Sequence, residues 1–284
     1  MSAAARLFDP RPCELGEGAL WHPTRQQIFW FDILGRRLMS RQHGEALSWR
    51  FDECVSAAGW VDAGTLLIAS ETGLWRFDVD TGARSLLAPL EADSPATRSN
   101  DGRADPFGGF WIGTMGKAAE PGAGAIYRFY RGELRQLHAG LSIPNSICFA
   151  PDGGTAYFAD TARRQVMRQR LDAEGWPQGG AEPFLDLRAQ GLNPDGAVTD
   201  AEGGIWIALW GAGRVARFTA QGRHDRDIAV PGRQTTCPAF GGGDFSALYV
   251  TTAREGLADP GPAEGATYLA DPGATGLAEP RVLL

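Results

Sequence analysis

A turn followed by a short aromatic strand recurs six times along this chain, and this repeat restricts the possible folds more than any other feature. The turn has the form Asp-x-x-Gly or Pro-Asp-Gly-Gly, and Pro151–Gly154 is the clearest example. Asp-Gly and Gly-Gly supply the positive φ angles of tight hairpins. The strands that follow the turns are Gln27–Asp32, Gly64–Ala69, Gly109–Gly113, Gly154–Asp160, Gly204–Ala208 and Ala247–Thr251. Their central residues are spaced by roughly 40–50 residues, which is the range of propeller blades.

Six such units predict an all-β chain folded as a six-bladed β-propeller. A four-stranded blade cannot bury both faces alone, and packing blades in a ring covers those faces. Further strands with period-2 alternation, such as Gly73–Asp78 and Gly213–Phe218, agree with this fold. A pair of β-sandwiches is the alternative, but the regular spacing suits it less well. We expect residues 1–284 to form one propeller domain.

Closing the ring requires both ends of the chain to lie in one blade. We therefore expect Ala5–Phe8 to pair with Thr267–Ala270 or with Pro280–Leu284.

Polar residues precede the predicted inner strands in four of the repeats. They are Glu17, the pair Asn100 and Asp101, Asn145, and Asp195. The innermost strands of a propeller line its channel, so loops that enter them from one end should meet at one point. A Glu, an Asn carbonyl and an Asp form an oxygen-only set, which suits hard cations such as Ca²⁺, Mg²⁺ or Mn²⁺. Asn-Asp-Gly and Pro-Asp-Gly are also ordinary turn sequences, so the residues alone leave both a metal site and plain turns open.

Several other chemistries lack their motifs in this sequence. There is no Gly-x-Ser-x-Gly elbow, no phosphate-binding P-loop and no His-Glu-x-x-His pair. The four histidines are scattered, with no spacing that pairs them as ligands. The four cysteines stand far apart without a Cys-x-x-Cys pair, which predicts reduced structural thiols. They are Cys13, Cys54, Cys148 and Cys237.

Charge and hydropathy limit the partners. The net charge is −7 and the chain has no run of five basic residues, which argues against a nucleic-acid surface. No stretch approaches the roughly 18 apolar residues of a membrane span. The N-terminal residues Met1–Phe8 lack the apolar core of a signal peptide, so we expect a cytoplasmic protein. A monomer is the default expectation.

Five ordered segments resemble the regucalcin/gluconolactonase family of senescence-marker-like sugar lactonases, and the resemblance covers nearly the whole chain. The segments are Leu15–Trp21, Arg98–Asp105 with Phe110–Met115, Asn145–Gly153 with Tyr157–Thr161, Pro194–Gly203 with Ile205–Ala208, and Pro238–Gly242 with Leu248–Arg254. The family is a six-bladed propeller, in agreement with the repeat. This sequence has Ala19 where the family often has Pro, and its loop after Met115 is short.

The resemblance also implies roles for individual residues. It implies that Glu17, Asn145 and Asp195 hold one divalent metal ion, which could be Ca²⁺, Zn²⁺, Mn²⁺, Mg²⁺ or Fe²⁺. Asp195 would also act as general base.

The substrate contacts implied by the resemblance come from Arg98 and Asn100. Glu120 lies in the short loop where some relatives place a substrate-binding Glu. The implied reaction is hydrolysis of a sugar (aldono) lactone to the aldonic acid. The alternatives are a metal-dependent organophosphate or aryl-ester hydrolase on the same scaffold, and a non-enzymatic calcium-binding propeller.

Overall fold

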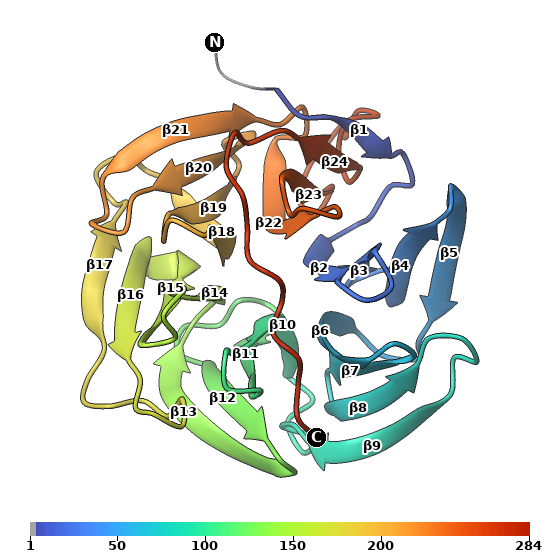
Figure 1. Ribbon diagram of the computed structural model, residues 1–284, viewed down its shortest axis with the longest axis vertical. Coiled ribbons are helices and arrows are strands. Elements are labelled where there is room, and N and C mark those ends of the chain that lie inside the picture. The colour runs from blue at the N-terminus through green and yellow to red at the C-terminus, as the bar shows by residue number, and fades with distance from the viewer. Residues whose placement is uncertain (1–3) are drawn as a thin grey trace.

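Six four-stranded antiparallel sheets radiate from a central channel (Figure 1). The computed structural model describes residues 4–284. Residues 1–3, which belong to the N-terminal stretch used above to predict the cellular location, lie outside the described residues. From the inside outward the sheets are β2-β3-β4-β5, β6-β7-β8-β9, β10-β11-β12-β13, β14-β15-β16-β17, β18-β19-β20-β21 and β22-β23-β24-β1, here called blades one to six. The predicted six-bladed β-propeller is therefore confirmed.

Each blade contains the same four strand positions. The innermost strands are β2 (Gly16–His22), β6 (Val55–Asp62), β10 (Thr97–Ala104), β14 (Pro144–Phe149), β18 (Asn193–Thr199) and β22 (Gln234–Gly241). The second strands are β3 (Gln27–Asp32), β7 (Thr65–Ser70), β11 (Phe110–Gly116), β15 (Thr155–Asp160), β19 (Ile205–Trp210) and β23 (Ala247–Ala253). The third strands are β4 (Arg37–Gln42), β8 (Gly73–Asp78), β12 (Gly124–Tyr130), β16 (Gln165–Arg170), β20 (Arg214–Phe218) and β24 (Thr267–Ala270). The outer strands are β5 (Glu45–Arg50), β9 (Arg84–Pro89), β13 (Glu133–Leu141), β17 (Glu182–Asp186), β21 (His224–Ala229) and β1 (Arg6–Asp9).

Helical structure in the described part of the chain is limited to one 3-10 turn, η1 (Thr161–Arg163). No helix in residues 4–284 has the length and apolar character needed to cross a membrane.

The aromatic strands of the sequence repeat are the second strands of the blades, not the innermost ones. The innermost strands begin with small or polar residues, as in Gly16–Gly18 and Asn193–Gly196, and their later residues, such as Leu20, pack between the blades. The polar candidates therefore lie within strands and not in loops before them, and this part of the prediction was wrong.

Aromatic and aliphatic side chains of the second strands fill the gaps between blades. Within residues 4–284 the buried apolar side chains form six clusters, one for each pair of neighbouring blades. Successive strand residues point to opposite faces. Thus Phe29 and Phe31 pack toward blade two, whereas Trp30 packs toward blade six. This alternation explains why an aromatic run marks each blade, since both faces of the second strand are buried.

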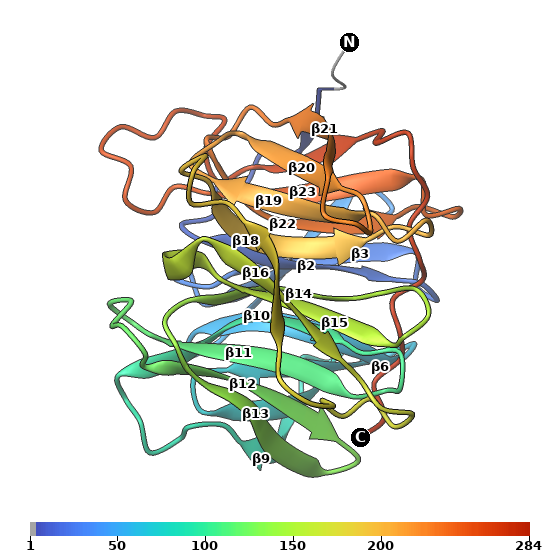
Figure 2. The same cartoon turned by 90° about the vertical axis from the view of Figure 1, so that its left-hand side faces the viewer.

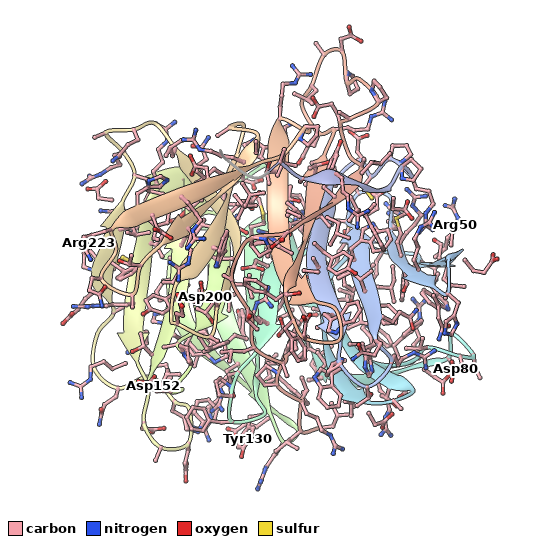
Figure 3. The ribbon with its side chains drawn as sticks, turned by 45° about the horizontal axis from the view of Figure 1, so that its top comes forward. Arg50, Asp80, Tyr130, Asp152, Asp200 and Arg223 are labelled. Atoms are coloured by element: carbon pink, nitrogen blue, oxygen red, sulfur yellow. The ribbon has the colours of Figure 1, made fainter. Side chains whose placement is uncertain are left out.

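Buried aspartates hold the turn before the aromatic strand in blades three and five. Asp200 accepts hydrogen bonds from the backbone N–H of Gly204 at 2.8 Å and from Arg217 Nε, on the third strand, at 2.7 Å. Asp105 makes the matching contact with Arg128 Nε at 2.6 Å in blade three. Figure 3 shows Asp200 nearer the centre of the ring than the labelled Arg50 and Arg223. These aspartates satisfy the turn and tie it to the blade.

The N-terminal strand β1 closes the ring by pairing with β24. Leu7 lies opposite Tyr268 in an antiparallel register, so the first of the two predicted pairings is confirmed. Asp9, at the end of β1, accepts hydrogen bonds from Arg11 Nε at 2.9 Å and from Arg41 Nε of blade one at 2.7 Å. The closing strand is thereby bonded to blade six and, through its carboxylate, to blade one.

The C-terminal segment 271–284 follows a different course from the predicted alternative. It forms no strand. It passes over one opening of the channel (Figure 1) and lies on that face of the ring (Figure 2). We call it the C-terminal strap. Glu279 in the strap forms a buried ion pair with Arg103, near the end of β10. Val282 is fully buried in the cluster between blades two and three, and its N–H donates to the carbonyl of Trp60 at 2.9 Å.

Candidate active site

A cavity of about 400 Å³ lies at the end of the channel where the innermost strands begin. Five of the residues predicted from the sequence line it: Glu17, Arg98, Asn100, Asn145 and Asp195. They come from β2, β10, β14 and β18, which belong to four different blades. The ring therefore brings together side chains that are far apart in sequence.

A break in strand register explains why these side chains reach the cavity. The pairing of β2 with β3 shifts between Glu17 and Leu20, and that of β14 with β15 shifts between Asn145 and Cys148. Strand β18 has the same irregularity around Asp195. Bulges of this kind bend a strand and re-aim its side chains. The turn-like sequences thus form bulges in the strands that face the channel.

Gly18 is required at the bulge of β2. Its φ angle is +58°, a conformation that other residues adopt with strain. A Cβ atom at this position would also lie 2.2 Å from the carbonyl oxygen of Ser56 in blade two. Only glycine therefore permits the backbone after Glu17 to pass this close to the neighbouring blade.

Glu17 and Asp195 form a pair of buried carboxyl groups. Burial, followed by the charge of Asp101, raises the pKa of Glu17 to about 8. Burial and then the charge of Glu17 raise the pKa of Asp195 well above its usual range. Two carboxylates in one buried site are costly unless a cation balances them.

The amide of Asn145 lies between two other polar groups. Its Oδ1 accepts a hydrogen bond from Asn100 Nδ2 at 3.1 Å, and its Nδ2 donates to Thr161 Oγ1 at 2.8 Å. The amide oxygen therefore faces Asn100, whose side chain also lines the cavity. It keeps a second lone pair for another partner.

Arg98 supplies positive charge to the wall of the cavity. Its Nη1 donates to Asn100 Oδ1 at 2.8 Å and to the carbonyl of Ser99 at 2.9 Å. Burial lowers the pKa of Arg98, while nearby carboxylates, with Glu255 the largest of them, act in the opposite direction. Within residues 4–284 both of its hydrogen bonds come from Nη1, which leaves Nε and Nη2 as donors for a bound molecule.

The family of the chain follows from a comparison with known proteins. Residues 15–254 match the SMP-30/Gluconolactonase/LRE-like region. The chain belongs to this SMP-30/gluconolactonase family. The resemblance predicted from the five sequence segments is therefore confirmed.

Similar members of the SMP-30/gluconolactonase family cover nearly the whole chain. An L-arabinolactonase of Azospirillum brasilense is 35% identical over 290 residues, which is 98% of this chain and 95% of that protein. A 6-deoxy-6-sulfogluconolactonase of Pseudomonas putida is 32% identical over 290 residues, covering 99% of each. The crystal structure of a calcium-binding protein, regucalcin, from Agrobacterium tumefaciens has a TM-score of 0.97 and 45% identity, and covers 99% of this chain and 98% of that one.

The donor set of this family member fits a divalent cation. Glu17 and Asp195 offer two carboxylates and Asn145 offers an amide oxygen, and hard cations prefer such oxygen ligands. In the part of the chain that the structure describes, no cluster of three carboxyl, thiol or imidazole side chains offers an alternative site. Burial of the two carboxyl groups is the main cause of their raised pKa values, and a bound cation would offset the cost of ionising them there.

Glu120 lies outside the group of residues that line the cavity. Its side chain is exposed, and Oε2 accepts a hydrogen bond from the backbone N–H of Ala118 at 3.1 Å. Ala118 and Ala119 of the same loop do line the cavity. Glu120 thus shapes the loop in this structure, and its contact with a substrate stays a prediction.

Three cavity residues had no role in the sequence analysis. Glu255 is half-buried and follows the last family segment, and burial raises its pKa. Lys117 lines the cavity rim and pairs with Glu71 at 3.3 Å. Thr161 ends the third segment and is half-buried beside Asn145. Their position beside the family segments was the one sequence feature that could have pointed to them. Neither Glu255 nor Lys117 lies in a motif that suggests chemistry.

Proposed function

We propose that this chain is a divalent-metal-dependent hydrolase that opens the ring ester of a sugar lactone to give the aldonic acid. The observation that carries the proposal is the convergence of Glu17, Asn145 and Asp195, from three blades, in one cavity whose wall holds Arg98. The two relatives described above are named for lactones of sugar acids, which supports the substrate class.

The size and lining of the cavity suit a single sugar ring. Pockets for small ligands have volumes of roughly 300–1,000 Å³, and about 400 Å³ lies at the small end of that range. Leu15, Ile143 and Trp210 provide apolar surface, whereas Arg98 and Glu255 provide hydrogen-bonding groups. A polyhydroxylated ring offers both kinds of surface.

The residues divide the reaction between them. A divalent cation held by Glu17, Asn145 and Asp195 would polarise the ester carbonyl and offset the negative charge that develops on its oxygen. Asp195 accepts a proton from the attacking water, and that proton passes to the ring oxygen as the ester C–O bond breaks. Arg98 donates hydrogen bonds from Nε and Nη2 to the substrate. The amide of Asn100 hydrogen-bonds to both Arg98 and Asn145 and so fixes their relative positions.

Hydrolysis of a panel of aldono-γ- and δ-lactones tests the proposal. Proton release at neutral pH would be followed after chelation and again after adding back Ca²⁺, Mn²⁺, Zn²⁺ or Fe²⁺. We expect turnover of one or two lactones that depends on the added metal. Faster cleavage of a phosphotriester or an aryl ester would identify the alternative hydrolase.

A calcium-binding module without catalysis is the remaining candidate, because the 45% identical solved structure is described as a calcium-binding protein. Tight Ca²⁺ binding with no turnover of any lactone would favour it over the enzyme.

A further inference from the structure

The hydroxyl of Thr161 links two of the innermost strands that carry the proposed metal ligands. Thr161 begins η1 in blade four and lines the cavity. Its Oγ1 donates a hydrogen bond to the carbonyl oxygen of Pro194 at 2.6 Å and accepts one from Asn145 Nδ2 at 2.8 Å. Pro194 directly precedes Asp195. One hydroxyl therefore contacts the ligand of blade four and the residue beside the ligand of blade five.

The proton count of this hydroxyl dictates which way the Asn145 amide turns. A threonine hydroxyl has one proton, and the carbonyl oxygen of Pro194 can only accept it. Thr161 Oγ1 is thus left as an acceptor toward Asn145, so the NH₂ group of Asn145 must face it. The amide oxygen then faces Asn100, and both side chains line the cavity.

An asparagine amide has nearly the same shape in either orientation, and only its hydrogen-bond partners distinguish oxygen from NH₂. Oxygen binds a cation, whereas an NH₂ group presents its protons and repels one. We infer that Thr161 is a positioning residue which holds the amide oxygen of Asn145 toward the metal; this inference rests on the metal site proposed above. Partners that orient a metal ligand in this way are worth about 10–100-fold in metal affinity.

Removal and partial restoration of the hydroxyl give the first test. Mn²⁺ would be titrated into chelator-treated protein, with the free ion measured by its electron paramagnetic resonance signal. We expect Thr161→Val to weaken Mn²⁺ binding by about 10–100-fold. Thr161→Ser keeps the hydroxyl and should bind within about threefold of the wild type. Thr161→Ala removes the same hydroxyl and serves as a second variant if valine distorts η1.

Substitution of Asn145 distinguishes two possible effects of Thr161: orienting the amide, or supporting the strand in general. Asn145→Asp replaces the amide with a carboxylate, whose two oxygens are equivalent, so neither orientation is wrong. In that background Thr161→Val should change Mn²⁺ affinity by less than about threefold. An equal loss in both backgrounds would overturn the inference, because Thr161 would then act on the strand and not on the amide.

Thr199 provides a matched control. Its Oγ1 donates to the carbonyl of Phe149 at 2.6 Å and joins the same two strands, β18 and β14, at their other end. Thr199→Val removes this bond without touching an amide, and Mn²⁺ affinity should stay within about twofold. A loss as large as that of Thr161→Val would contradict the inference.

The wild-type titration separates this inference from the proposed function. A wild-type protein that binds no Mn²⁺ would overturn the metal site and the role of Thr161 together. Wild-type binding that Thr161→Val leaves unchanged would overturn the role of Thr161 alone.

Discussion

Glu17 and Asp195 place two buried carboxyl groups in one cavity, although the first belongs to blade one and the second to blade five. Burial contributes most to the raised pKa of each group. The charge of Glu17 raises the pKa of Asp195 further, whereas the hydrogen bond with Asp195 lowers that of Glu17. The arrangement is unfavourable for the protein alone and favourable for a protein that binds a cation. The stability of the fold and the chemistry of the site are therefore coupled at this pair.

The role of Asp195 is testable with two substitutions of the same kind. Asp195→Asn removes the general base and a proposed metal ligand, so we expect lactone hydrolysis to fall by at least roughly 10²–10⁴-fold. Asp152 also lies in a Pro-Asp-Gly sequence, but it is exposed and accepts the N–H of Gly154 at 2.9 Å. Asp152→Asn should leave kcat/KM unchanged. Retained activity of metal-depleted Asp195→Asn protein would contradict the proposed mechanism.

The stability of the metal-free protein should depend on pH through Glu17. Its pKa of about 8 lies above the ordinary value of 4.5, so the folded protein holds a proton that the unfolded chain releases. This stabilisation is complete below pH 4.5 and is lost as the pH rises through about 8. Metal binding needs the ionised carboxylates, so added metal should raise the Tm more at high pH than at pH 6.

Thermal unfolding of chelator-treated protein between pH 5 and pH 9, with and without Mn²⁺, measures both effects. Glu17→Gln cannot ionise at this position, so its metal-free form should show a flatter dependence and its Mn²⁺ affinity should fall. An equal Mn²⁺-induced rise in Tm at both ends of the range would contradict this coupling.

The C-terminal strap should contribute to stability through the ion pair of Glu279 with Arg103. Both side chains are buried, so Glu279→Ala removes the carboxylate that pairs with Arg103 and leaves it backbone carbonyl acceptors. Breaking a buried pair in this way costs about 3–5 kcal/mol. Glu202 makes a comparable pair with Arg217 at 3.0 Å, but its side chain is 80% exposed. Glu202→Ala should therefore cost no more than about 1 kcal/mol in denaturant unfolding. Equal losses would show that the strap contact is not a buried pair in solution.

Two glutamates near the cavity should differ in their effect on substrate binding. Glu255 lines the cavity, and Glu255→Gln replaces a charged acceptor with a neutral one, so we expect KM to rise by about three- to tenfold. Glu120→Gln keeps the carbonyl oxygen that accepts the Ala118 N–H, and its KM should change by less than about twofold. A larger effect at Glu120 would show that its side chain contacts the substrate, as the family resemblance implies.

The sequence by itself predicted the blade count, because the signal is local. A buried second strand must be apolar on both faces, so aromatic runs such as Phe29–Phe31 recur once in each blade. The turns before the runs of blades two to six contain glycine and aspartate, for backbone reasons that act within a few residues. The pairing of the N-terminal strand with β24 followed from the closure of the ring.

Other features depended on contacts between distant segments, and only the tertiary structure decided them. The starts of the inner strands resemble turns in the sequence, because bulges and turns use the same residues. The close approach of Gly18 to Ser56 in the neighbouring blade is visible only in the tertiary structure. The course of the strap, the place of Glu255 in the cavity and the hydrogen bond from Asn145 to Thr161 depend on contacts that have no periodic signal in the sequence. Local propensity therefore determined the number of blades, whereas the packing of the ring determined which polar groups meet.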